Sequence, residues 1–221
     1  MEPKDFFLPI KIVAFDFDQT LVDEVASIRH RWKETLQEFS HIHKALEKTF
    51  FSIFDAKGPA YKAHLDDTLR ELSLPESHIG PMVDFFRTTR SSKEFVYEHA
   101  REVVELLKER GFRIGIITDG LRNYQENRIK SAGLNELCDF IYYGDDYQKP
   151  DPVFFRSCIE REKILPGQFL YVGDHITKDI EGALAVGAKA CYIGNEYNAV
   201  LSQEAICFKT MYQFHKWLKQ K

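Results

Sequence analysis

The sequence has few cysteines, no long apolar run and no excess of basic charge, and each shortage argues against a class of protein. Its four cysteines are scattered without a Cys-x-x-Cys pair, which favours reduced core thiols over a disulfide framework or a zinc site. No segment approaches the ~20 apolar residues that cross a bilayer. Lys and Arg number 30 against 34 Asp and Glu, for a net charge of −4. We therefore expect neither a nucleic acid polymer nor a membrane surface as a main partner.

The N-terminal stretch is not typical of a targeting signal. Residues 1–18 carry acidic side chains inside the apolar segment and show no small-residue cleavage pattern, so a signal peptide is not expected. We expect a soluble, cytoplasmic protein. The length of 221 residues, with 44% hydrophobic and 29% charged residues, suffices for one large domain or for a core domain with a smaller insert.

Six short segments rich in β-branched and aromatic residues predict a parallel sheet. They show little alternation of polar and apolar residues, as is typical of strands that are covered on both faces. Helical patterns lie between them, and three of these end at a glycine. Strand and helix in alternation predict an α/β fold, a Rossmann-like parallel sheet with helices on both faces. The strands are expected at 10–15, 113–118, 139–143, 169–173, 189–194 and 205–208, and the helices at 99–111, 121–133, 177–187 and 210–220.

One interval interrupts this alternation. Between the first two predicted strands the sequence shows helical patterns only, separated by Gly-Pro and Pro breaks. We interpret residues 22–95 as an inserted α-helical cap domain, and residues 1–21 and 96–221 as the core domain. The helical stretches are expected at 27–54, 59–74 and 76–89.

Polar residues follow four of the predicted strands. In an open parallel sheet, ligands bind beyond the carboxyl ends of the strands, so these residues are expected to form one site. The first strand leads to Asp16 and Asp18, the second to Thr118, Asp119 and Gly120, the third to Lys149, and the fourth to Asp174, with Asp179 five residues later.

The chemistry that this set permits is narrow. Clustered carboxylates repel one another unless a cation holds them, and ligands that offer oxygen only, without His or Cys, favour Mg²⁺. Asp16 is the candidate nucleophile that would form an aspartyl phosphate. Asp18 is the candidate acid that protonates the leaving oxygen and then, as a base, activates water.

The remaining residues have supporting roles in this hypothesis. Thr118 and Lys149, with main-chain amides near Asp119 and Gly120, would bind the phosphoryl oxygens. Asp174 would complete the set of metal ligands. Asp179 would hold Lys149 or a metal-bound water, although an acid near the start of a helix is also a common structural feature.

Four stretches, DFDQTL, IITDG, KP and GDHITKD, resemble in this order the motifs of the haloacid dehalogenase superfamily, in its phosphatase branch. The interval 22–95 resembles the C1 cap of that superfamily, so the likeness covers the whole chain. The resemblance implies Asp16 as nucleophile, Asp18 as acid and base, and Mg²⁺ bound by Asp16, the main-chain carbonyl of Asp18 and Asp174. Gln19 and Asp119 depart from the residues most frequent in the motifs.

The expected function is Mg²⁺-dependent hydrolysis of a small phosphomonoester, a sugar phosphate or a nucleoside monophosphate. A phosphomutase would use the same residues. A 2-haloacid dehalogenase would need the Asp16 nucleophile but no acid at Asp18, because halide leaves without a proton. In another class, a receiver-type signalling module also phosphorylates an aspartate, but it resembles a single domain of little more than half this length. The sequence gives no indication of oligomeric state.

Two further expectations concern residues near the motifs. His175 is expected to line the cleft without a catalytic role. The basic residues Arg122, Arg128 and Lys130 are expected on the solvent-facing surface of the helix at 121–133.

Overall fold

The computed structural model describes residues 6–59, 61–89, 93–145, 148–195 and 205–220. The chain divides into two compact units. Unit 1 comprises Met1–Asp23 and Phe95–Lys221, and unit 2 comprises Glu24–Glu94. The second unit is therefore an insertion between two segments of the first.

Unit 1 is built on a six-stranded sheet in which every pairing is parallel, in the order β3-β2-β1-β4-β5-β6. The strand order reverses at β1, which lies between β2 and β4. This is the position where ligands bind in folds of this kind. The strands are β1 (Ile12–Phe15), β2 (Arg113–Ile117), β3 (Phe140–Tyr142), β4 (Phe169–Gly173), β5 (Lys189–Ile193) and β6 (Ile206–Phe208).

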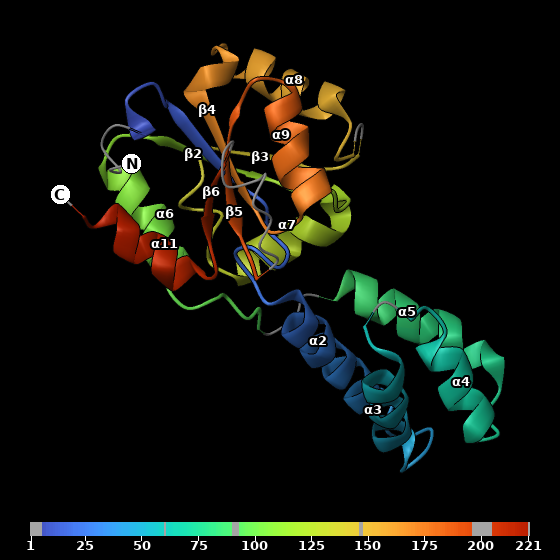
Figure 1. Ribbon diagram of the computed structural model, residues 1–221. Coiled ribbons are helices and arrows are strands. Elements are labelled where there is room, and N and C mark those ends of the chain that lie inside the picture. The colour runs from blue at the N-terminus through green and yellow to red at the C-terminus, as the bar shows by residue number, and fades with distance from the viewer. Residues whose placement is uncertain (1–5, 60, 90–92, 146–147, 196–204, 221) are drawn as a thin grey trace. The chain divides into compact units, whose positions relative to one another are not determined.

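Helices cover both faces of this sheet (Figure 1). Residues of α6 (Ala100–Glu109), α7 (Arg122–Ser131) and α11 (Met211–Leu218) share one buried apolar cluster with alternate residues of the strands. Residues of α8 (Pro152–Arg161) and α9 (Gly182–Ala185) share a second cluster with the other strand residues. The α/β, Rossmann-like class predicted from the sequence is confirmed. Two-sided burial explains why the strands are continuously apolar.

The segment after β4 departs from the predicted regular helix. Residues 177–187 were expected to form one helix, but the chain first makes a π-helical segment at Ile176–Glu181, labelled η3, and only then α9. π-helical turns are rare and often occur at functional sites. Here the wide turn carries Asp179 to a fully buried position.

Unit 2 is helical throughout its described residues, with α2 (Glu24–Glu38), α3 (Leu46–Lys57), α4 (His64–Glu71), the 3₁₀ turn η1 (Glu76–His78) and α5 (Ile79–Thr88). The single helix expected at 27–54 is wrong, because the chain turns between Glu38 and Leu46. In this turn, the ring of His41 contacts the Glu38 carbonyl, and the amide of Ala45 donates to the ring of His43. A core of its own holds the unit together, centred on Phe50, which is fully buried.

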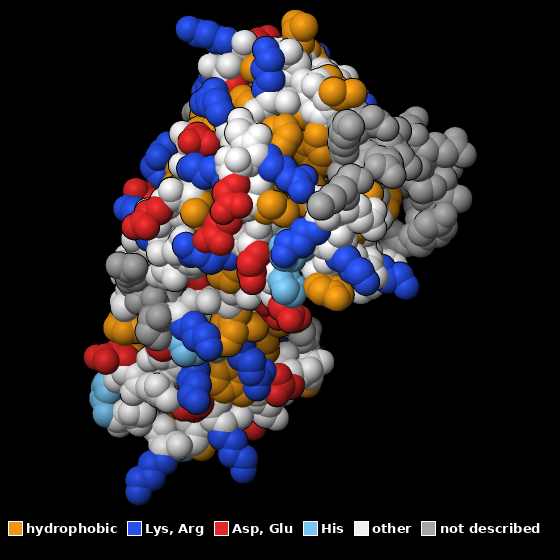
Figure 2. Space-filling model, turned by 90° about the vertical axis from the view of Figure 1, so that its left-hand side faces the viewer, with side chains coloured by type: hydrophobic (Ala, Val, Ile, Leu, Met, Phe, Trp, Pro, Cys, Tyr) orange, Lys and Arg blue, Asp and Glu red, His pale blue; other side chains and the backbone are white. Residues whose placement is uncertain are grey.

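The described part of the chain contains no helix that is both long and apolar enough to cross a membrane. All four cysteines are free thiols, as the sequence predicts. Acidic and basic side chains are interspersed on the face shown in Figure 2, in agreement with the small net charge.

Candidate active site

Three carboxylates from two adjacent strands meet at the carboxyl edge of the unit 1 sheet. Asp16 follows β1 and Asp174 follows β4, and the two strands run side by side in register. The main-chain amide of Asp16 donates to the Val172 carbonyl at 2.8 Å, which extends the pairing to the site itself. One carboxylate oxygen each from Asp16, Asp174 and Asp179 lies within 4.8 Å of the others. Residues far apart in the sequence thus form one acidic cluster.

The ammonium of Lys149 lies within this cluster. Lys149 Nζ donates to Asp16 Oδ1 at 2.8 Å, to Asp179 Oδ1 at 2.6 Å and to the Tyr171 hydroxyl oxygen at 3.0 Å. The side chain is only 3% exposed. Such a buried cation is stable only with close anionic partners, so Lys149 and the two carboxylates depend on one another.

Asp179 is fixed from two directions. Its Oδ1 accepts from Lys149, and its Oδ2 accepts from the main-chain amide of His175 at 2.9 Å. The carboxylate also lies directly over the end of β4, where a Cβ on Gly173 would come within 2.4 Å of Asp179 Oδ2. The glycine at the end of the strand therefore makes room for this acid.

Burial and charge shift the pKa values of the cluster. Burial, reinforced by Asp179, raises the pKa of Asp16 well above its usual value, although Lys149 opposes this. Burial and Asp179 raise the pKa of Asp174 to about 6. Burial lowers the pKa of Lys149, but Asp16, Tyr171 and Asp179 outweigh it and hold that pKa well above its ordinary range. The site therefore has a surplus of negative charge that a cation would relieve.

Thr118, Asp119 and Gly120 form the loop after β2. Thr118 is buried, and its Oγ1 accepts from the Gly120 amide at 3.2 Å. Asp119 Oδ1 accepts from the main-chain amide of Lys149 at 2.8 Å, and Asp119 Oδ2 lies 3.5 Å from Lys178 Nζ. The Asp119 side chain thus fixes the loop that carries Lys149, which is a role that the sequence did not reveal.

The Asp18 carboxylate is not one of the three that converge. Its Oδ1 accepts from Arg128 Nη1 at 2.6 Å and its Oδ2 accepts from Gln125 Nε2 at 2.5 Å. Both partners belong to α7 and are buried. The expectation that Arg128 lies on the helix surface is wrong, since only 1% of this residue is exposed.

The sequence patterns did not identify three residues that contact the site: Gln125, Arg128 and Tyr171. Gln125 and Arg128 lie three residues apart on a helix that starts just after the Thr118 loop, so both occupy one face near the carboxyl edge. This spacing is the only signal available, because α7 is polar over most of its length. Tyr171 gives no signal, because an aromatic residue in a buried strand is common.

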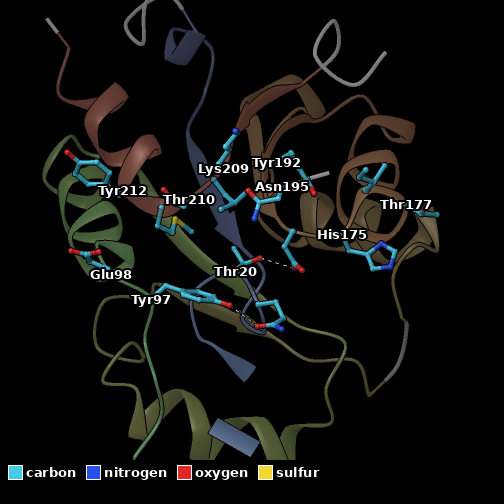
Figure 3. A pocket seen from close by; sticks show the side chains of 16 residues that line it. Thr20, Tyr97, Glu98, His175, Thr177, Tyr192, Asn195, Lys209, Thr210 and Tyr212 are labelled. Atoms are coloured by element: carbon cyan, nitrogen blue, oxygen red, sulfur yellow. Dashed lines mark hydrogen bonds between the residues drawn. The ribbon is translucent and has the colours of Figure 1, made fainter. Parts of the chain in front are cut away.

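A pocket of about 1040 Å³ adjoins the cluster within unit 1, and Figure 3 shows the side chains that line it. Asp174 forms part of its wall, and the Thr20 hydroxyl donates to Asp174 Oδ1 at 3.1 Å. His175 is exposed and lines the pocket, as expected. The volume is of the size that small ligands occupy.

Gln19 adopts a left-handed backbone conformation in the motif turn, with φ of 58°. A non-glycine residue there is strained by of the order of 1 kcal/mol or more. Its side chain is held by the Tyr97 hydroxyl, which donates to Gln19 Oε1 at 2.9 Å, and both residues line the pocket (Figure 3). The hydrogen bond with Tyr97 therefore helps to hold Gln19 in this conformation.

The donor set fits a hard divalent cation. The converging groups offer oxygen only, and buried carboxylates outnumber the cations that contact them, as a site for Mg²⁺ requires. Asp16 and Asp174 are the carboxylates that directly follow the strands. Asp16 and Asp179 each also have one oxygen bound to Lys149.

Comparison with known proteins agrees with this geometry. Residues 13–193 match the family model described as haloacid dehalogenase-like hydrolase. The glyceraldehyde 3-phosphate phosphatase of Pyrococcus abyssi is 27% identical over 194 residues, covering 83% of this chain and 81% of its own length. The phosphoglycolate phosphatase of Nitrosospira multiformis is 27% identical over 203 residues, covering 87% of each chain. Among solved structures, a phosphatase of this superfamily from Thermococcus onnurineus aligns with a TM-score of 0.60 and 25% identity, over 95% of this chain and 98% of its own.

The fold and the acidic site at its strand ends define a hydrolase. The chain belongs to the haloacid dehalogenase-like hydrolase family, because the family model matches most of its length. The resemblance inferred from the four motifs is thus confirmed.

Proposed function

We propose that this chain is a Mg²⁺-dependent phosphatase that hydrolyses a small phosphomonoester through an aspartyl phosphate on Asp16. The proposal rests on one observation: the carboxylates of Asp16, Asp174 and Asp179 meet at the edge of the sheet, and two of them, Asp16 and Asp179, bind the ammonium of Lys149. The names of two relatives, which refer to glyceraldehyde 3-phosphate and phosphoglycolate, support a small substrate. We propose a sugar phosphate or a nucleoside monophosphate.

In this mechanism Asp16 is the nucleophile, and Asp18 is the general acid and base. Lys149 holds Asp16 Oδ1, so the other oxygen attacks phosphorus while the ester P–O bond breaks. The leaving oxygen takes the proton from Asp18, which enters this step as the carboxylic acid and leaves it as the carboxylate. Asp18 then accepts a proton from water, whose oxygen attacks phosphorus and releases Asp16 and inorganic phosphate. Bound Mg²⁺, held by Asp16, Asp174 and the Asp18 carbonyl, would neutralise the charge that otherwise keeps the phosphoryl group from the carboxylate.

The phosphoryl oxygens need donors as charge spreads over them. Lys149 supplies an ammonium, Thr118 a hydroxyl, and the loop of Asp119 and Gly120 its main-chain amides. Asp179 acts on the reaction indirectly, because it orients Lys149 through the 2.6 Å ion pair.

We also propose that the helical insertion, residues 22–95, serves as the cap domain of the enzyme. Two features support this role, its position between β1 and β2 and its own core, which makes it a separate unit. A cap of this kind would exclude water and contribute residues that select the substrate.

The decisive experiment is a phosphate-release assay over a panel of phosphorylated metabolites, with Mg²⁺ and with chelator. We expect activity in Mg²⁺ only, loss of activity in Asp16→Asn, and wild-type activity in Glu160→Gln, an exposed carboxylate on α8. Acid quenching during turnover should trap phosphate on a peptide that contains Asp16. If wild type and Asp16→Asn hydrolyse a generic aryl phosphate equally, the proposal is wrong.

The same assay separates hydrolysis from phosphoryl migration. A phosphatase releases one inorganic phosphate for each ester consumed. If a sugar phosphate is instead isomerised without phosphate release, the chain is a phosphomutase.

A further inference from the structure

Two buried residues of α7, Gln125 and Arg128, connect the proposed acid with the proposed phosphate-binding threonine. Gln125 is 2% exposed and Arg128 is 1% exposed. Buried polar groups of this kind must find hydrogen-bond partners, and both find them in the site. Neither residue belongs to the four motifs.

The orientation of the Gln125 amide follows from its partners. Arg128 can only donate, and Arg128 Nη1 lies 3.0 Å from Gln125 Oε1. An Asp18 oxygen that carries no proton can only accept, and Asp18 Oδ2 lies 2.5 Å from Gln125 Nε2. The amide oxygen therefore faces the guanidinium and the amide nitrogen faces the carboxylate. The second hydrogen of Nε2 points to Thr118 Oγ1, at 3.0 Å.

This arrangement determines the direction in which the Thr118 hydroxyl donates. A hydroxyl oxygen accepts two hydrogen bonds and donates one. Thr118 Oγ1 accepts one from Gln125 Nε2 and one from the Gly120 amide. With both acceptor positions used, the hydroxyl hydrogen remains to donate to an anion such as a phosphoryl oxygen.

The same pair fixes the Asp18 carboxylate. Arg128 Nη1 binds Oδ1 at 2.6 Å, and Gln125 Nε2 binds Oδ2. A carboxylate offers about four acceptor positions, so these two donors leave a position free to carry the proton that goes to the leaving oxygen and later to take one from water. The aromatic ring of Phe17 lies on the guanidinium, 5.1 Å from Arg128 Cζ to the ring centroid, and helps to hold it in place.

We infer that Gln125 and Arg128 are positioning residues, which orient the Asp18 carboxylate for proton transfer, and that Gln125 also aims the Thr118 hydroxyl at the phosphoryl group. This inference rests on the proposed phosphatase function. It assigns different effects to the two residues, because Gln125 contacts Thr118 directly, whereas Arg128 reaches Thr118 only through Gln125, whose amide the Asp18 carboxylate also orients.

The first test compares two esters by kcat/KM, which reports on the steps up to loss of the alcohol. An alkyl phosphate, whose alkoxide leaves poorly, depends on the Asp18 proton, and 4-nitrophenyl phosphate depends on it little. General acid catalysis contributes about 100-fold or more. We expect Arg128→Met and Gln125→Met to lower kcat/KM for the alkyl ester by about that factor, and for the aryl ester by only about a few-fold. Arg128→Lys should recover part of the loss.

The second test uses inorganic phosphate as a competitive inhibitor. Gln125→Met should weaken phosphate inhibition by about 5-fold or more, in keeping with a lost hydrogen bond to a charged group. Arg128→Met should leave it within about 2-fold, a difference of less than 0.5 kcal/mol. The matched control is Lys130→Met, an exposed cation on the same helix that pairs with Glu126, and it should leave both readouts unchanged.

Different results overturn different statements. If wild type hydrolyses neither ester, the proposed function fails and this inference fails with it. If wild type is active and the α7 variants lose both esters equally, or neither, only the positioning roles are refuted. In an Asp18→Asn background, Arg128→Met should cause little further loss for the alkyl ester, because both changes act through one group. An additive loss would contradict the inference. Should Arg128→Met fail to fold, Arg128→Lys and Gln125→Met provide the same comparison.

Discussion

Repulsion within the acidic cluster should lower the free energy of unfolding of the metal-free protein. The variant Asp174→Asn, which lacks one of these charges, tests this. Asparagine has nearly the same shape as aspartate and can still accept the hydrogen bond from the Thr20 hydroxyl. The substitution therefore removes charge and little else. Burial, together with Asp179, raises the pKa of Asp174 to about 6, whereas an aspartate in an unfolded chain has a pKa of about 4.

The sign of the effect follows from proton binding. Between pH 4 and pH 6, the folded wild type holds a proton on Asp174 that the unfolded chain has released. The free energy of unfolding therefore falls as pH rises through this window, and the full penalty is present above it. A difference of about two pKa units corresponds to about 3 kcal/mol, and partial solvent access reduces this to about 1–3 kcal/mol. At pH 8 in chelator, Asp174→Asn should melt at least about 2 °C above wild type.

Calorimetry in chelator at a series of pH values measures this difference. We expect the advantage of Asp174→Asn to shrink as pH falls from 6 to 4 and to disappear below pH 4, where Asp174 is protonated in both states. Saturating Mg²⁺ should reverse the order, because a ligand at 100 times its Kd stabilises the wild type by about 2.7 kcal/mol and the variant lacks a ligand. A variant that is less stable than wild type in chelator at pH 8, or a difference independent of pH, would refute the reasoning.

Three further substitutions or reactions probe other parts of the molecule. Lys149→Met leaves Asp16 and Asp179 without their buried cation and should lower the free energy of unfolding by about 3–5 kcal/mol; a urea midpoint equal to that of wild type would contradict the ion-pair network. Phe50→Ala, in the core of unit 2, should lose a similar amount, about 3–5 kcal/mol, and a small loss would mean that this core is loosely packed. Burial raises the pKa of Cys158 to about 12, so iodoacetamide at pH 8 should alkylate it about 1,000-fold more slowly than a free thiol; labelling at the free-thiol rate would show that the thiol is accessible.

The sheet could be predicted because a short, continuously apolar segment that ends in polar residues is typical of a buried parallel strand and of few other structures. The structure trims five of the six segments by a residue or two, whereas β4 has the predicted bounds; β1, for example, starts at Ile12 rather than residue 10. The turn between Glu38 and Leu46 could not be predicted, because it contains neither glycine nor proline. Hydrogen bonds of the His41 and His43 rings to the main chain stabilise the turn instead. Such bonds depend on the three-dimensional position of the side chains and cannot be read from the sequence.

The residues of the four motifs were predictable because each follows a strand, and parallel strands bring their ends together. Their supporting contacts were not. Arg128 lies in a helix with acidic and basic neighbours, and no periodicity separates its buried position from the exposed position of Lys130. The side chain is buried because Asp18 and Phe17 receive it, and neither partner is near it in the sequence.

The charges of the site explain why the proposed reaction needs a metal ion. Lys149 neutralises part of the charge on Asp16 and Asp179, and Arg128 does so for Asp18, whereas the Thr20 hydroxyl that donates to Asp174 is neutral. Four carboxylates against two contacting cations leave an excess of about two negative charges when all are ionised, which is the charge of one divalent cation. A phosphoryl group brings more negative charge to the same place. The order in which ligands bind would then follow from electrostatics, because a phosphate ester meets a site without excess negative charge only after the cation has neutralised it.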